Sequence, residues 1–315
     1  MYYLNLLGGV FLGWSLGAND ASNIFGTAVT SRMIRFGTAA VLASIFVVIG
    51  AVLEGAAGME TLSGMGRQSM ASATVISVAT ALSVTLLTVW KLPVSTSQAV
   101  VGAILGRGLF ASDLHFKGLT KVLLCWVGTP LGAMAVAVVL YFGLRTLLRR
   151  LRVNFVALDG YLRWGLILAG CYGAYALGAN NVANVTGVFM GLGLFGLEGH
   201  SEALVLALIG SLSIAVGICT FSHRVMATVG KSLYKLDAFA AFVAVSAHAL
   251  TVHFYAWVGV PVSTSQAIIG AVVGIILVRG VHLLEWRPLV RIMVGWVATP
   301  IIAGAVSLAG CWLFL

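Results

Sequence analysis

About ten apolar stretches of membrane-spanning length follow one another along this chain and leave little room for a water-soluble fold. A helix needs about 20 apolar residues to cross the hydrocarbon core of a bilayer. Only 9% of the residues are charged, whereas a soluble domain carries about 25%. The sequence therefore predicts an all-α, polytopic membrane protein with about ten helical segments, within a range of about eight to twelve. The apolar stretches span residues 4–31, 36–57, 71–90, 93–109, 121–144, 163–195, 203–222, 238–258, 261–279 and 288–315.

The net charge of +9 indicates membrane topology rather than nucleic-acid binding. Arg145, Arg149, Arg150 and Arg152 lie between two long apolar stretches, and basic residues between spans mostly mark the cytoplasmic side. If each stretch crosses once, most of the 18 basic residues lie on that side and both termini lie outside. We therefore predict a multi-pass protein of the cell (inner) membrane, in contact with lipid, with a cytoplasmic central loop.

The two halves of the chain repeat three motifs in the same order. A Gly-Ala-Asn motif recurs at 17–23 and 178–184, a Pro-Val-Ser-Thr-Ser-Gln motif at 93–98 and 261–266, and a Trp-Val-X-Thr-Pro motif at 126–130 and 296–300. An odd number of crossings per half would invert the second repeat in the membrane. Inverted repeats with interrupted hydrophobic segments at matching positions are typical of secondary transporters.

This pattern predicts a first membrane repeat over 1–144, a basic cytoplasmic linker over 145–162 and a second membrane repeat over 163–315. The first two motifs interrupt the apolar stretches. We expect broken helices at Asn19-Asp20 and Asn180-Asn181, and re-entrant hairpins at the Pro-Val-Ser-Thr motifs.

Each Pro-Val-Ser-Thr motif places hydroxyl groups where a helix is expected to begin. Proline suits the first helical position, and free backbone amides with the helix dipole favour an anion there. Two such helix starts that met near the membrane midplane would surround one tetrahedral oxyanion. The alternative, in which the hydroxyls bond back to their own helices, fits two matched copies less well. The predicted anion-binding residues of the two motifs are Ser95, Thr96, Ser97, Gln98, Ser263, Thr264, Ser265 and Gln266.

Asp20 is an ionisable residue inside an apolar stretch, which makes it a functional candidate because its burial in a membrane is costly. A bare carboxylate would repel an anion, so we expect Asp20, with Asn19, Asn23 and backbone carbonyls of a broken helix, to hold a coupling cation. The alternative is an aspartate that caps an interfacial helix. In the second half Asn180 and Asn181 occupy the matching positions and offer oxygen ligands without charge. No metal beyond a coupling Na⁺ and no cofactor are expected.

These motifs resemble those of the PiT family of inorganic phosphate transporters, and the resemblance extends over nearly the whole chain. Thr228-Val229-Gly230, after Arg224, is also similar to the family. The resemblance implies an inverted-repeat fold, a homodimer, and phosphate uptake coupled to Na⁺ or H⁺. It also implies that the hydroxyl triplets contact the anion and that Asn23 and Asn184 lie at or beside the anion and cation sites.

The chain departs from the family in ways that concern the transported anion. Asn181 stands where phosphate transporters of the family usually carry Asp, Gln98 and Gln266 stand where the family often has His or another residue, and the chain is short. Hydrogen phosphate can donate a proton and so gains from an acceptor such as Asp20, whereas sulfate requires only donors. The loss of one Asp and the gain of amide side chains thus favour sulfate, whereas the retained Asp20 favours phosphate. We expect phosphate symport with Na⁺ or H⁺, with a sulfate permease of the same fold as the alternative.

Two other protein classes are weaker alternatives. Gly13-Trp14-Ser15-Leu16-Gly17 matches the G-x-S-x-G pattern, which with His248 or His253 would suggest an intramembrane serine protease. That pattern requires a strand-to-helix turn, whereas these glycines lie in an apolar stretch and favour close helix packing. An anion channel would share a polar pore but would not need the duplication. We therefore predict a transporter and not an enzyme.

Overall fold

The computed structural model describes residues 5–89, 94–113, 116–151, 154–226, 236–280, 284 and 286–315. Within these ranges the regular secondary structure is helical, which confirms the predicted all-α fold. Each predicted apolar stretch contains at least one helix. Six helices in the described ranges are long and apolar enough to cross a membrane, as a polytopic protein requires: α3, α5, most of α7, α9, α11 and α13.

The helices fall on either side of a junction between α7 and α8. Before it lie α1 (Leu6–Asp20), α2 (Ser22–Thr30), α3 (Phe36–Glu54), α4 (Ala56–Ser63), α5 (Met70–Val89), α6 (Thr96–Ala111) and α7 (Phe116–Arg150). After it lie α8 (Phe155–Thr186), the short 3₁₀ helices η2 (Gly187–Phe189) and η3 (Leu194–Gly196), α9 (Gly199–Thr220), α11 (Ala238–Trp257), α12 (Thr264–Arg279) and α13 (Trp286–Phe314).

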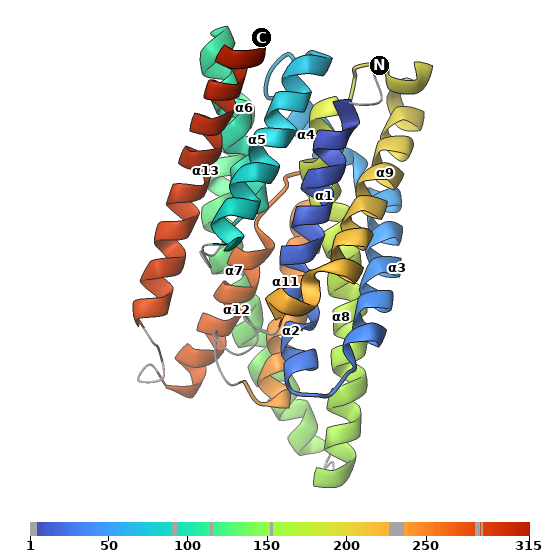
Figure 1. The fold of residues 1–315 in the computed structure, drawn as a ribbon. Coiled ribbons are helices and arrows are strands. Elements are labelled where there is room, and N and C mark those ends of the chain that lie inside the picture. Colours follow the sequence, from blue (N-terminus) through green and yellow to red (C-terminus); the bar gives the residue numbers. More distant parts are fainter. Residues whose placement is uncertain are drawn as a thin grey trace.

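Two antiparallel helix pairs enter the bundle from opposite ends. Helix α1 begins and α13 ends at one end of the molecule, close to the α5–α6 pair, while the α7–α8 junction lies at the other end, towards which the α11–α12 pair extends (Figure 1). Asp237, just before α11, pairs with Arg279 at the end of α12 and so closes the base of the second pair.

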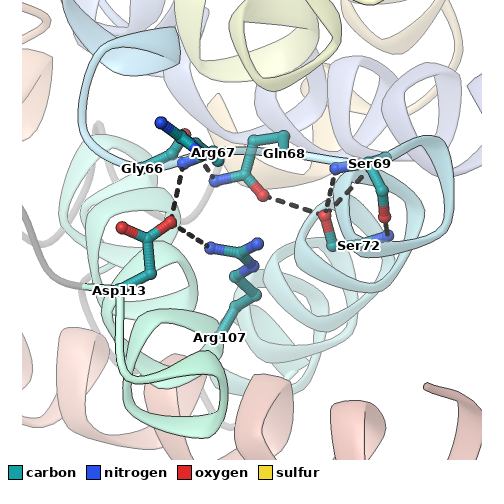
Figure 2. A network of polar contacts seen from close by, with 7 residues as sticks. All are labelled: Gly66, Arg67, Gln68, Ser69, Ser72, Arg107 and Asp113. Atoms are coloured by element: carbon teal, nitrogen blue, oxygen red, sulfur yellow. Dashed lines mark hydrogen bonds and ion pairs between the residues drawn. The ribbon is translucent and has the colours of Figure 1, made fainter.

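The base of the α5–α6 pair is fixed by a polar network. Figure 2 shows Asp113 Oδ2 accepting hydrogen bonds from Arg107 Nη1 (3.4 Å) and from the backbone amide of Arg67 (3.1 Å). Beside it, Ser72 Oγ donates to Gln68 Oε1 at 3.0 Å. The network ties the segment before α5 to the residues after α6. An ion pair thus lies at the base of each helix pair.

The third repeated motif marks two close helix crossings. A Cβ atom added to Gly102 of α6 would collide with the carbonyl oxygen of Pro300 in α13, and one added to Gly270 of α12 would collide with that of Pro130 in α7. Small residues allow helix backbones to approach this closely in membranes. Each hairpin helix therefore rests directly on the backbone of a long, proline-containing helix.

Replacing Gly102 or Gly270 with alanine is expected to lower the melting temperature of the detergent-solubilised protein. The added methyl group overpacks a backbone crossing, which costs about 1–3 kcal/mol. Gly143→Ala in α7 is the matched control, because nothing lies within 4 Å of a Cβ atom there and alanine favours a helix by about 1 kcal/mol. Thermal unfolding of all three variants checks the prediction, and equal melting temperatures would contradict it.

The structure does not show unwound backbone at either of the two predicted helix breaks. In the first half only Ala21 separates α1 from α2, and its φ of −57° and ψ of −25° are helical, so the backbone is not unwound. The predicted break at Asn180-Asn181 is wrong, because α8 continues through both residues. In the first half, Ser22 Oγ donates a hydrogen bond to the carbonyl oxygen of Asn19 at 2.7 Å, and so competes with the backbone amides of the helix for that acceptor. In the second half, the Asn180 side chain bonds to another segment and does not compete with the hydrogen bonds of its own helix.

The predicted linker 145–162 is helical for most of its length. Helix α7 extends through Arg150 and α8 begins at Phe155. A sharp boundary at residue 144 therefore does not coincide with the end of a helix. The division into repeats over 1–144 and 163–315 stays a prediction.

Candidate functional site

Two helices begin at the same motif and are capped in the same way. Ser95 precedes α6 and Ser263 precedes α12, and their hydroxyl oxygens accept hydrogen bonds from the backbone amides of Gln98 (3.3 Å) and Gln266 (3.2 Å). Serine caps of this kind satisfy one of the free amides at a helix start. The first helical amides have no partner within the helix, and the dipole adds partial positive charge. Each motif thus forms a helix start suited to an anion. Pro93 of the first motif lies outside the described residues.

The two helix starts meet each other in the core. Ser97 Oγ donates to the carbonyl oxygen of Val262 at 2.8 Å, and Ser265 Oγ donates to that of Val94 at 3.2 Å. Each motif therefore holds the backbone of the other, across 165 and 171 residues of sequence. The structure brings together the two predicted hydroxyl triplets, all of which are buried: Ser95, Thr96, Ser97, Ser263, Thr264 and Ser265.

Asp20, at the end of α1, contacts the start of α12. Its Oδ2 accepts a hydrogen bond from Thr264 Oγ1 at 2.9 Å, and its Oδ1 accepts one from Asn19 Nδ2 at 3.0 Å. Asn23 Nδ2 in α2 donates to the same threonine oxygen at 3.3 Å. No basic side chain in the described part of the chain pairs with this buried carboxylate. A buried, unpaired charge is costly, and carboxylate, hydroxyl and amide oxygens are ligands that suit a small hard cation.

The second half of the chain contributes a related group without charge. Asn184 Nδ2 donates to Ser97 Oγ at 2.8 Å and to Asn181 Oδ1 at 2.9 Å. The hydroxyl of Thr96, which matches Thr264 in sequence, has no hydrogen-bond partner in the ranges that the structure describes. The two halves of the site therefore differ both in charge and in hydrogen bonding.

Asn180 braces the backbone, a role that its position in the sequence does not indicate. Its Nδ2 donates to the carbonyl oxygen of Val260 at 3.2 Å, and its Oδ1 accepts from the amide of Val262 at 3.0 Å. Thr61 Oγ1 in α4 donates to the neighbouring carbonyl of Gly259. A buried segment outside a helix needs such partners for its backbone groups. Asn180 therefore positions the segment that leads into α12, and its side chain bonds to that segment rather than to Asp20.

Several buried polar atoms in this region lack a hydrogen-bond partner among the described residues. A folded protein seldom leaves such atoms unpaired, because each costs about 1–3 kcal/mol. Their concentration around the two helix starts indicates a place where a polar ligand completes the hydrogen bonding. The atoms are Thr96 Oγ1, Gln98 Oε1, Gln266 Oε1, Asn181 Nδ2 and Asn184 Oδ1.

The residues of the alternative serine-protease hypothesis do not form a catalytic group. Ser15 lies inside α1, with its Oγ 3.2 Å from Thr85 Oγ1. His253 is engaged elsewhere, with Nε2 2.7 Å from Glu54 Oε2 and Nδ1 2.6 Å from the Tyr172 hydroxyl. A serine nucleophile needs a base within hydrogen-bond reach. The glycines beside Ser15 instead allow close packing of α1 on α9.

Comparison with known proteins gives concordant matches along the whole chain. A family model described as "Phosphate transporter family" matches residues 16–159 and 151–307. A curated protein of Methanocaldococcus jannaschii named "Putative phosphate permease" is 29% identical over 300 residues, which cover 95% of this chain and 93% of the relative. A protein of the same name from Pyrococcus horikoshii is 28% identical over an alignment of 387 residues, gaps included, which covers 96% of this chain and 95% of the relative.

A solved structure described as "The sodium-dependent phosphate transporter" has the same fold. The TM-score is 0.86 at 22% sequence identity, and the match covers 99% of this chain and 98% of the other. The long helices and the two hairpins thus belong to a known architecture.

Proposed function

Since the chain belongs to the phosphate transporter family, we propose that it is a secondary transporter that imports inorganic phosphate together with Na⁺. Members of such a family are transporters, so the prediction that the chain is not an enzyme is confirmed. The coupling ion, the direction of transport and the binding residues are the parts of this proposal that go beyond family membership.

The observation that carries the proposal is the meeting of two capped, hydroxyl-bearing helix starts in a buried site. Ser97 and Ser265 bond across to the opposite motif, and helix starts are established anion sites because of their free amides and dipoles. Donors directed from two sides suit a tetrahedral oxyanion better than a planar or monatomic anion. The proposed contacts are both hydroxyl triplets, with Gln98, Gln266, Asn23 and Asn184 beside them.

Asp20 supports the second part of the proposal, the coupling cation. The carboxylate is buried with Asn19, Asn23 and Thr264 as neighbours, and a bound Na⁺ would neutralise it before phosphate enters. The similar solved structure is that of a sodium-dependent transporter, which supports Na⁺ rather than H⁺ as the coupling ion. Asn180 and Asn181 could contribute only side-chain oxygen atoms to the proposed cation site. The hydrogen bonds of Asn180 to Val260 and Val262 instead favour a role in holding the segment before α12.

The choice of phosphate over sulfate follows from the hydrogen-bond acceptors of the site. Hydrogen phosphate can donate its proton to an acceptor such as Asp20 or Gln98 Oε1, whereas sulfate at neutral pH has none to donate. Buried acceptors without partners, Gln98 Oε1, Gln266 Oε1 and Asn184 Oδ1, therefore favour an anion that carries a proton. A sulfate permease is the competing assignment.

Uptake into proteoliposomes tests the proposal directly. Labelled phosphate and labelled sulfate are supplied in turn, each with an inward Na⁺ gradient, an inward H⁺ gradient or no gradient. We expect phosphate to accumulate above equilibrium only with Na⁺, because a carrier uses the ion gradient and a channel does not. Accumulation of sulfate alone would assign a sulfate permease, equilibration without accumulation would indicate a channel, and no uptake of either anion would refute the proposal.

The proposed orientation follows the basic residues. We propose that the α7–α8 junction, which carries Arg149 and Arg150, faces the cytoplasm across the inner membrane, and that both termini face outside. The two halves would then be inverted repeats, each contributing one hairpin tip to the site. A homodimer is proposed from the family resemblance alone.

A further inference from the structure

One edge of the α1–α2 segment is polar and partly exposed, while most of the segment's other residues are buried. Asn19, Asn23, Thr27 and Thr30 recur every three or four residues and are partly exposed. Of the residues between Asn19 and Thr30 on the other faces, all but the partly exposed Val29 are buried, Phe25 among them. This spacing places the four polar side chains on one side of the helix, with successive residues about 4.5–6 Å apart along its axis.

The same edge carries residues of the candidate site at one end and reaches the surface at the other. Asn19 bonds to Asp20, and Asn23 bonds to Thr264 at the start of α12. Beyond Thr30 the chain is exposed at Ser31. In Figure 1, α2 extends from the middle of the bundle towards the end that holds the α7–α8 junction. The polar edge thus runs from the buried site to that end of the molecule.

The matching part of the second half is closed. Asn184 corresponds to Asn23, and both Asn184 and Asn180 are fully buried. Four residues after Asn184 the chain has the buried Val188, where the first half has Thr27 four residues after Asn23. The first half of the chain thus has partly exposed residues beside the site where the second half has buried ones, and a polar Thr27 where the second half has the apolar Val188.

Thr27 is distinguished from its neighbours on this edge by its free hydroxyl. In the ranges that the structure describes, Thr27 Oγ1 is itself buried, although part of the side chain is exposed, and it has no hydrogen-bond partner. The hydroxyl of Thr30 instead donates to the carbonyl oxygen of Gly26 at 2.7 Å, within its own helix. An anion that leaves a low-dielectric site needs donors along its way, because an ion without partners there is strongly disfavoured. Thr27 offers the first such donor one turn beyond Asn23.

We propose that this polar edge lines the route by which the oxyanion passes between the site and the end of the molecule that holds the α7–α8 junction, and that Thr27 contacts the passing anion. The inference rests on the proposed function, since it names the path of the same transported phosphate. It assigns the structure a state in which this side of the site is partly exposed and the opposite side, at Asn180, Asn184 and Val188, is buried.

Cysteine labelling tests the route. Thr27→Cys and its matched control Ala28→Cys, a buried neighbour, are made in a variant whose native cysteines Cys125, Cys171, Cys219 and Cys311 are replaced by alanine. A membrane-impermeant thiol reagent is applied from each side of the membrane. We expect the cysteine at position 27 to react at least about tenfold faster than that at position 28, from one side only, and to be protected by phosphate with Na⁺. Equal rates at the two positions, or labelling unaffected by phosphate, would overturn the inference.

Uptake by variants with the native cysteines supplies a second, independent test. Thr27→Val keeps the shape of the side chain but removes the hydroxyl, so we expect the maximal rate of phosphate uptake to fall about three- to tenfold. Thr27→Ser should restore it. Thr80→Val in α5 is the control, because its hydroxyl donates to the carbonyl oxygen of Ile76 within its own helix and lies outside the polar edge. Wild-type rates in Thr27→Val would refute the role of Thr27 while leaving the proposed function intact, whereas absence of phosphate uptake in the wild type would refute the proposed function itself.

Discussion

Replacing Asp20 with asparagine is expected to lower Na⁺-driven accumulation of phosphate by about 100-fold or more. Asparagine preserves the size of the side chain and one oxygen acceptor, but it removes the buried negative charge. The proposed Na⁺ then has no carboxylate to bind, and the amide that faces Thr264 brings hydrogens where the cation needs oxygen. Concentrative uptake of labelled phosphate into proteoliposomes, at saturating and at limiting Na⁺, measures the loss.

Two controls separate coupling from folding in this experiment. Ser15→Ala changes a neighbouring turn of α1, where the Ser15 hydroxyl lies 3.2 Å from that of Thr85 and away from the site, so uptake by this variant should stay within about twofold of wild type. Asp20→Glu retains the charge and should retain part of the Na⁺ dependence. Equal loss in the Ser15 and Asp20 variants would show that Asp20 is not the coupling residue.

Replacing Thr264 with valine is expected to lower the rate of phosphate uptake by about 10- to 100-fold. Its single hydroxyl both donates to Asp20 Oδ2 and accepts from Asn23 Nδ2. Valine has the same shape, so its effect arises because two buried polar groups each lose a partner. The initial rate of uptake and its dependence on Na⁺ measure the change, and Thr264→Ser should recover most of the activity.

Thr96→Val provides the matched comparison in the other half of the site. The Thr96 hydroxyl has no partner in the described part of the protein, so its loss breaks no bond and should leave the melting temperature unchanged. If the hydroxyl contacts the anion, the KM for phosphate should rise while the dependence on Na⁺ stays the same. Identical behaviour of the Thr96 and Thr264 variants would contradict the asymmetry of the two halves.

The helical membrane fold was predictable because it depends on properties that each segment carries by itself. A long apolar stretch forms a helix in a membrane, since every backbone group must be satisfied within the segment. The repeated prolines of the Trp-Val-X-Thr-Pro motif were also visible, and the structure places them against Gly102 and Gly270 at the crossings of α6 with α13 and of α12 with α7. The polar edge from Asn19 to Thr30 could have been found from its helical spacing.

The candidate site was only partly predictable. The serine caps at Ser95 and Ser263 are local interactions, so the motif that forms them could be recognised in each half. The break expected at Asn180-Asn181 was wrong because the same sequence motif meets different neighbours in the two halves. The Asn180 side chain is used by a segment 80 residues further along the chain, and α8 stays intact.

The sequence by itself determined membrane residence, the position of the helices and the two anion-suited helix starts, because each of these depends on composition or on interactions within a few residues. Only the tertiary structure decided that Asp20 lies against Thr264, 244 residues away, that Asn180 braces the α12 hairpin, and that one side of the site is partly exposed while the other is buried. Those features depend on which distant segments pack together, and identical motifs acquire different partners when their surroundings differ.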